Sequence, residues 1–199
     1  MPGISFTAID LATANSDSAA VCGVGLAKVQ DGRIVDRTSW LIKPPPGLGH
    51  FDPVNTEFHG ISAEDVASAA DWEMSVEGIL HFTREDPLVA YNAVHNAEVM
   101  LKASDRLNLD LPAKDFYCAL ELAQNQLRLP RRSLKDTLAA LKLPPVPQAE
   151  PGANAVACAK IVLAIARMRK MGSLEEIWTE PTVSVGRKPQ GRRRKHSSE

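Results

Sequence analysis

The sequence has few cysteines, and they are not paired. Cys22, Cys118 and Cys158 lie far apart among 199 residues, with no closely spaced cysteine pair. A disulfide-stabilised secreted domain or a cysteine zinc site uses cysteines at paired spacings. We therefore expect three buried thiols in a reducing compartment, which predicts a cytoplasmic location.

Long apolar stretches are also missing. No run approaches the roughly 18 apolar residues that cross a bilayer. Residues 1–5 lack the basic start and apolar core of a signal peptide. We therefore expect no membrane span and no membrane partner. No internal repeat is visible, and a hydrophobic content of 44% over 199 residues predicts one globular domain with an appendage.

Charge is distributed unevenly along the chain. Residues 187–199 hold six Lys or Arg and one Glu, giving +5, whereas the other residues hold 17 basic and 23 acidic side chains, giving −6. A segment as basic and polar as this tail buries too little apolar surface to fold. We therefore predict a folded domain over residues 1–172 and an extension over 173–199, with a disordered tail at 187–199.

The first part of the sequence predicts three consecutive strands joined by short connections. Apolar runs predict strands at 4–10, 20–29 and 33–42, and Asp31-Gly32 is typical of a two-residue hairpin turn. Strands and helices then alternate, with strands predicted at 87–91 and 116–118, and helices starting at Ser62 and at 75–83, 96–107, 119–128, 134–141 and 153–170. This order favours an α/β fold with a mixed five-stranded sheet, its first three strands antiparallel, flanked by helices.

Proline and glycine mark the predicted connections. Residues 43–57 are rich in both and predict a loop, and Pro144–Pro147 predicts a second one. Ser62 and Asp65 have the spacing of a capping box, which indicates a helix start. We expect Trp178 to attach residues 173–186 to the domain weakly.

Five segments in chain order resemble the motifs of one nuclease family. They are Ala8–Asn15, the His-Gly-Ile turn and helix of His59–Val66, Leu88–Asn96, Leu134–Leu141 and Ala153–Ala159. Together they resemble the DEDDh-type 3′–5′ exonucleases, the group of the epsilon proofreading subunit of DNA polymerase III. The resemblance covers most of residues 4–171 and implies a ribonuclease-H-like fold.

The resemblance also implies a two-metal active site. In such sites two Mg²⁺ or Mn²⁺ ions clamp the attacking water and the leaving oxygen, and a histidine removes the proton from the water. The resemblance places the metal ligands at positions 10, 12, 96 and 158 and the base at position 153. Here these positions hold Asp10, Ala12, Asn96, Cys158 and Ala153, so one of the five motif residues remains.

Each replacement removes a specific chemical capacity. Ala12 removes a ligand, and Asn96 has the shape of an aspartate without its charge. Cys158 is a soft thiol that suits Mg²⁺ poorly, and its helical spacing with Ile161 and Ile165 predicts a core position. Ala153 cannot act as a base. We therefore expect no cofactor, with Mg²⁺ or Mn²⁺ bound only if activity remains.

Neighbouring residues offer limited compensation. Glu98 and His95 are expected to face away from the site, since they lie off the helix face of Asn96. Glu150 precedes Ala153 by three residues and is a candidate to swing into the site. Asp10 has two open interpretations, a weak single-metal ligand or a polar residue hydrogen-bonded to Asn96 or Thr13.

Several residues are candidates for nucleic-acid binding. The resemblance brings the terminal nucleotide to Thr13 and Asn15, where backbone N–H groups would bind phosphate. Tyr91 is predicted to stack on a base or to pack, and Asn92 corresponds to an asparagine of the family motif. The tail residues Arg192, Arg193, Arg194 and Lys195 would bind phosphates without sequence preference. His59 is expected to be a turn residue bonded to the backbone.

Three functions remain open from the sequence. The first is a catalytically inactive exonuclease-like module that binds single-stranded DNA or RNA. The second is a protein-interaction module whose partner is a polymerase, a replication or repair protein, or an active nuclease. The third is a residual 3′–5′ exonuclease that uses Asp10 and a borrowed ligand.

Overall fold

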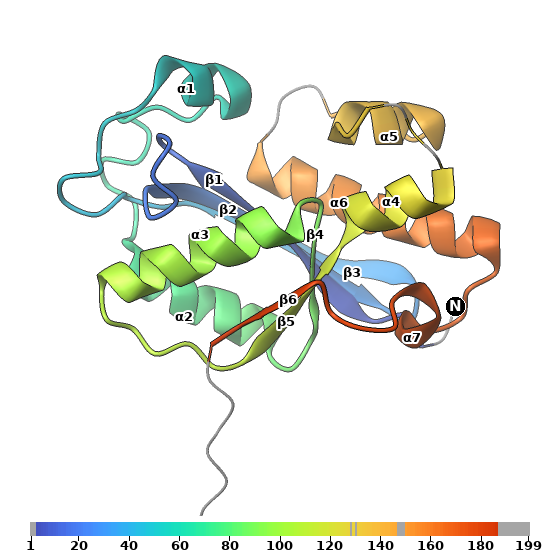
Figure 1. Ribbon diagram of the computed structural model, residues 1–199. Helices are drawn as coiled ribbons and strands as arrows, with labels where there is room; N and C mark the ends of the chain where they lie inside the picture. Colours follow the sequence, from blue (N-terminus) through green and yellow to red (C-terminus); the bar gives the residue numbers. More distant parts are fainter. Residues whose placement is uncertain (1–2, 128, 130, 147–149, 187–199) are drawn as a thin grey trace, which may run out of the picture.

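A mixed sheet of six strands forms the centre of the molecule (Figure 1). The computed structural model describes residues 3–127, 129, 131–146 and 150–186. Within them the strand order is β3-β2-β1-β4-β5-β6. The strands are β1 (Phe6–Thr13), β2 (Val21–Gln30), β3 (Arg33–Leu41), β4 (Leu88–Ala90), β5 (Lys114–Cys118) and β6 (Val183–Val185).

The antiparallel start of the sheet agrees with the sequence prediction. β1 pairs antiparallel with β2, and β2 pairs antiparallel with β3. Asp31 and Gly32 connect β2 to β3 with φ angles of 49° and 74°. Two successive positive φ values are what a type I′ hairpin turn requires, which confirms the predicted turn.

The sheet has one strand more than predicted. β4 runs parallel to β1, β5 runs parallel to β4, and β6 pairs antiparallel with β5. β6 has three residues, too few to show a periodic pattern in the sequence, and its pairing with β5 makes it a strand. Trp178 packs against Tyr117 with ring centroids 5.3 Å apart. Residues of the predicted extension therefore join the sheet of the domain.

Helices cover both faces of the sheet. They are α1 (Pro53–His59), α2 (Trp72–Thr83), α3 (Ala93–Arg106), α4 (Ala119–Leu127), α5 (Leu134–Ala140), α6 (Pro151–Arg169) and α7 (Leu174–Ile177). Side chains alternate along a strand, so Phe6 and Ala8 pack with α4, α5 and α6, whereas Ile9 and Leu11 pack with α2 and α3. Asp10 has the parity of Ala8 and so faces α6.

Two sequence predictions for the segment after β3 were wrong. Residues 43–57, predicted as a loop, contain most of α1, which starts at Pro53 after an extended Asp52; proline at the first helical position has a suitable fixed φ. The Ser62 and Asp65 side chains do form reciprocal hydrogen bonds. They stabilise a series of turns over residues 63–68 rather than an α-helix.

α6 is more apolar than the sequence analysis expected. With 19 residues and a mean hydropathy of 1.2, it is long and apolar enough to cross a membrane by length and composition alone. However, 61% of its apolar window is buried inside the molecule, where it packs on β1 and β2. These properties are those of a core helix.

The approach of α6 to the sheet depends on Gly25. Gly25 lies directly opposite Asp10 in the β1–β2 ladder. A β carbon on Gly25 would collide with the backbone of Pro151 and Gly152 at the start of α6. Because Gly25 has no side chain, the first turn of α6 lies directly on the sheet beside Asp10.

We expect Gly25→Ala to destabilise the protein by about 3 kcal/mol or more, because backbone atoms of α6 must move to admit the methyl group. Gly49→Ala is the matched control, since nothing lies within 4 Å of its added β carbon. We expect the control to stay within about 0.5 kcal/mol of the wild type. Urea unfolding of the two variants measures the difference, and equal stability would contradict the proposed packing role of Gly25.

Candidate functional site

A large cleft lies where β1 and β4 end. The carboxyl ends of parallel strands meet at one edge of a sheet, which is where α/β folds commonly place their sites. The cleft has a volume of about 1310 Å³. Its walls come from the end of β1, the loop after it, α1, the first turn of α3, α5 and the first turn of α6.

Asp10 is hydrogen-bonded to an asparagine of α6. The Asn154 Nδ2 donates to Asp10 Oδ2 at 3.0 Å. Burial raises the pKa of Asp10 from 3.8 to about 7; the hydrogen bond from Asn154 opposes this rise, and the negative charge of Glu150 adds to it. The predicted partners, Asn96 and Thr13, are therefore replaced by Asn154. The raised pKa makes the charged carboxylate form of Asp10 less available near neutral pH.

Asn96 uses both ends of its amide for hydrogen bonds within the protein. Its Oδ1 accepts from the Leu11 backbone N at 2.8 Å, and its Nδ2 donates to the Asn92 carbonyl at 3.0 Å. The side chain is buried. Asn96 thus ties the first turn of α3 to β1, and an aspartate could make only the first of these two bonds.

Cys158 lies in the core beneath Asp10. Its thiol is buried among apolar side chains of α6 and the sheet, as its helical spacing predicts. Burial raises the pKa of the Cys158 thiol well above its usual value, and the nearby Asp10 and Cys118 raise it further. The thiol is therefore neutral at physiological pH.

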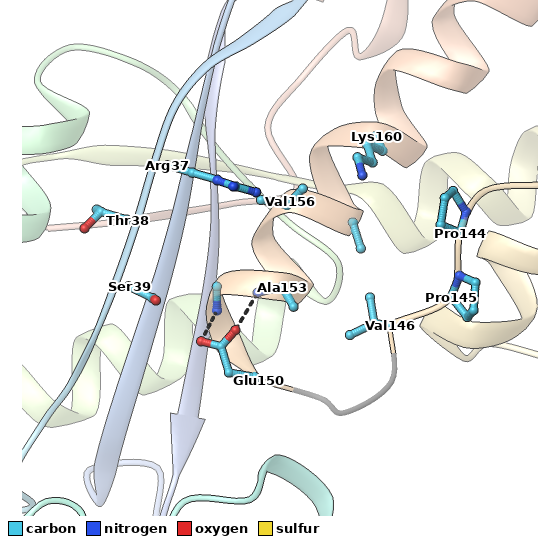
Figure 2. Close-up of a pocket in the computed structure, with 12 residues that line it drawn as sticks. Arg37, Thr38, Ser39, Pro144, Pro145, Val146, Glu150, Ala153, Val156 and Lys160 are labelled. Carbon is cyan, nitrogen blue, oxygen red and sulfur yellow. Dashed lines mark hydrogen bonds between the residues drawn. The ribbon is translucent and has the colours of Figure 1, made fainter.

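The remaining motif positions offer no ligand atoms. Ala12 lines the cleft with its methyl group. Ala153 lines a separate, smaller groove on the other side of α6. Glu150, the candidate borrowed ligand, caps α6 instead: its two carboxylate oxygens accept from Gly152 N at 2.9 Å and Ala153 N at 2.8 Å (Figure 2).

These residues do not fit a two-metal cluster. Such a cluster needs several carboxylate oxygens around two hard cations, whereas the site combines one carboxyl of raised pKa with an amide, a thiol and two methyl groups. In the described part of the chain, no group of three or more His, Cys, Asp or Glu side chains is arranged to hold a metal ion. We therefore derive no catalytic step through a metal.

The loop after β1 is held by side-chain hydrogen bonds. The Asn15 Nδ2 donates to the carbonyls of Leu48 and His50 at 3.1 and 2.9 Å. The Ala14 backbone N donates to the Ala20 carbonyl at 2.8 Å. Thr13 and Asn15 both line the cleft, but the Asn15 amide and the Ala14 N–H are engaged in holding the loop.

His59 has the structural role that the sequence predicts. Its Nδ1 accepts from Ile61 N at 3.0 Å, and its Nε2 lies 3.1 Å from the Thr13 carbonyl. Burial lowers the pKa of His59, although the Thr13 bond opposes this shift. A neutral ring with its proton on Nε2 satisfies both contacts.

Tyr91, Asn92 and His95 all line the cleft. The Tyr91 hydroxyl lies 2.7 Å from Thr137 Oγ1 and so connects β4 to α5. The Asn92 side chain caps α3 by accepting from His95 N at 3.4 Å. The expectation that His95 faces away was wrong, because the cleft surrounds the exposed start of α3 and more than one helix face reaches it. Glu98, one turn further, is exposed outside the cleft.

Several residues of the cleft were not predicted from the sequence, among them Asn154, Val54, Phe58 and Lys135. Asn154 had a usable signal, since it lies four residues before Cys158 on the same helix face. Val54 and Phe58 are 76% and 68% exposed on α1, a helix that the sequence did not predict. Lys135 projects from α5 into the lining. The predicted phosphate-binding tail, Arg192 to Lys195, lies outside the described residues.

Comparison with known proteins identifies relatives by fold only. No protein-family model and no curated protein matches the sequence. Among solved structures, exonuclease X in complex with 5′-overhanging duplex DNA is 20% identical, with a TM-score of 0.64 over 86% of this chain and 99% of that chain. The nuclease domain of 3′hExo, a DEDDh family member bound to rAMP, is 11% identical, with a TM-score of 0.67 over 85% and 94%.

A third similar structure is a zinc-bound complex of E. coli exonuclease I with single-stranded DNA. It is 15% identical, with a TM-score of 0.69 over 84% of this chain and 41% of that chain. The structural neighbours thus include DEDDh-type 3′–5′ exonucleases that match most of the chain. They confirm the predicted exonuclease-type, ribonuclease-H-like fold, while identities at this level leave the chemistry to be argued from the site.

Asp10 should make stability fall as pH rises. Its carboxyl has a higher pKa in the folded state, about 7, than its ordinary 3.8, so the folded state binds the proton more tightly and loses stability between these values. We expect Asp10→Asn to remove this loss. With a chelator present to exclude metal, the difference in unfolding free energy between variant and wild type should change by about 2.5 kcal/mol from about pH 5 to about pH 8. A constant difference would contradict the burial of the carboxyl.

Divalent metal should not stabilise the wild-type protein. Millimolar Mg²⁺ or Mn²⁺ raises the melting temperature only of a protein that binds it in the folded state. We expect no rise for the wild type. A rise is expected for the variant that combines Ala12→Glu, Asn96→Asp, Ala153→His and Cys158→Asp, which restores the family's ligand and base residue types. Differential scanning fluorimetry with and without metal tests this, and a wild-type rise that Asp10→Ala abolishes would refute it.

Proposed function

We propose that this protein is an exonuclease-fold module that binds single-stranded nucleic acid in its cleft without hydrolysing it. One observation carries the proposal. The cleft is wide and open, whereas the positions that hold metal in DEDDh-type enzymes carry neutral or internally hydrogen-bonded groups. The proposal keeps the binding part of the family function and omits its metal-dependent step.

The charge of the cleft favours the binding of nucleic acid without metal over a metal site. Its acidic side chains are Asp10 and Glu57, and its basic ones are Lys135, His95 and His59, the last a neutral ring held by backbone contacts. The raised pKa of Asp10, about 7, reduces its negative charge at neutral pH. With the other family carboxylates replaced, a phosphate backbone meets less repulsion without metal than it would in an active enzyme.

Exposed apolar side chains supply a surface for bases. Phe58 and Val54 line the cleft from α1 and are more than half exposed. Aromatic faces bind unpaired bases by stacking, and this binding tolerates any sequence. Neighbours of this fold are solved with DNA, exonuclease X with an overhanging duplex and exonuclease I with a single strand, which supports nucleic acid as the ligand.

A protein-interaction function is the second candidate. The same exposed side chains, Val54 and Phe58, would suit an apolar segment of a partner protein. One structural neighbour is an ExoI complex named ExoI/SSB-Ct. A replication or repair protein or a polymerase is the kind of partner that this candidate implies. The interaction function predicts that an apolar protein segment binds with little dependence on salt, whereas phosphate binding is strongly salt-dependent.

The test is single-strand binding in chelator. Labelled single-stranded DNA and RNA should bind, and Lys135→Glu and Phe58→Ala should each weaken binding about tenfold, since a stacked base is worth about 1–3 kcal/mol. Lys102→Glu and Met74→Ala are matched controls, exposed on α3 and α2 outside the cleft. Fluorescence anisotropy measures the affinities.

Three outcomes separate the candidates. Loss in the cleft variants and none in the controls supports the proposal. No binding to any strand would refute it and favour the interaction function. Loss only when residues 187–199 are removed would assign binding to the tail and not to the cleft.

A further inference from the structure

A second hollow lies beside the cleft, on the other side of the first turns of α6. This side groove has a volume of about 540 Å³ and is bounded by β3, the start of α6 and residues 144–146 (Figure 2). Volumes of this size are typical of small-ligand sites. Gly152 lies close to Ser39 in this lining, since a β carbon on Gly152 would be 2.9 Å from the Ser39 side chain.

Two cationic side chains from different elements line the side groove. Arg37 comes from β3 and Lys160 from α6; Figure 2 shows Arg37 reaching from β3 toward α6 at Val156, with Lys160 further along α6. Both residues are exposed. Among the residues that the structure describes, neither forms an ion pair or a side-chain hydrogen bond. Their charges are therefore available to an anion from solution.

The acid in the lining does not neutralise these cations. Glu150 directs both carboxylate oxygens to the backbone of Gly152 and Ala153. The sum of Arg37, Lys160 and Glu150 leaves the groove with a charge of +1. The rest of the lining is mainly apolar, with Pro144, Val146 and Val156 among it. A ligand with a phosphate and a flat apolar body matches this combination.

The side groove adjoins the cleft. Val146 lines both hollows, and the consecutive residues Ala153 and Asn154 line the groove and the cleft respectively. The two hollows are therefore neighbours at the first turn of α6. Every nucleotide of a strand carries a phosphate, so a strand in the cleft has phosphates to offer to the adjacent groove.

We infer that the side groove binds a nucleotide phosphate between Arg37 and Lys160, with the strand in the cleft as its source. The choice of source rests on the proposed function, whereas the phosphate chemistry rests on the groove itself. Arg37 contributes a planar fork of donors and Lys160 a point charge, and both bind phosphate without reading the base. The groove thereby extends the binding surface beyond the cleft and adds affinity without adding sequence choice.

The experiment measures single-strand affinity at several salt concentrations for the full chain in chelator. The variant Arg37→Ala with Lys160→Ala is compared with Arg33→Ala with Arg167→Ala. The control pair removes the same charge from the same strand and helix, at exposed residues that line neither hollow. Losing the one phosphate held by both cations should weaken binding roughly tenfold and reduce the slope of log K against log salt by about 0.7. The control should change affinity less than about twofold.

A second arm titrates adenosine monophosphate and follows the groove residues by NMR. Strand affinity lost only in the groove pair supports the inference with the strand as source. A different result is that no strand binds, while the monophosphate shifts groove signals in the wild type and not in the Arg37→Ala, Lys160→Ala variant. The groove would then bind a free nucleotide, and only the proposed cleft function would be refuted. Equal loss in both pairs, or monophosphate shifts unaffected by Arg37→Ala with Lys160→Ala, would overturn the inference.

Discussion

The close contact between Gly25 and the start of α6 determines which side chains of α6 lie next to Asp10. Gly25 lies opposite Asp10 on the face of the sheet that α6 covers. Because no β carbon separates them, the backbone of Pro151 rests on β2. This packing brings Asn154 within 3.0 Å of Asp10 and places Cys158 beneath it. One missing side chain thus brings a helix and a strand close enough to make a polar pair.

Two polar side chains at this point, Asp10 and Asn96, form hydrogen bonds within the protein. A buried carboxylate is costly unless it is paired or hydrogen-bonded, and burial raises the pKa of Asp10 to about 7 despite the bond from Asn154. The Asn96 amide accepts a hydrogen bond from β1 and donates one to the start of its own helix. These arrangements stabilise the fold at positions where the motif resemblance predicts metal ligands. They also leave the cleft less acidic, which favours an anionic ligand.

The sequence was informative where periodicity or a motif was long. The hairpin at Asp31-Gly32, the antiparallel start and the core position of Cys158 follow from local patterns. The sequence did not predict β6, with three residues, or α1, with seven, because elements this short have no periodic pattern and form through contacts with the rest of the fold. Without α1, the exposed Phe58 and Val54 could not be placed on the cleft. The partner of Asp10 was missed because Asn154 comes 144 residues later, and only the approach of α6 brings the two together.

The most direct test of the central proposal is a metal-dependent 3′–5′ nuclease assay. Labelled single-stranded DNA and RNA are incubated with the full chain and Mg²⁺ or Mn²⁺, with Asp10→Ala as the control for contaminating nuclease. The account predicts either no cleavage or cleavage that is equal in the wild type and the control. Cleavage that requires Asp10 would contradict it, because the site would then assemble a working metal centre despite the groups at positions 12, 96, 153 and 158.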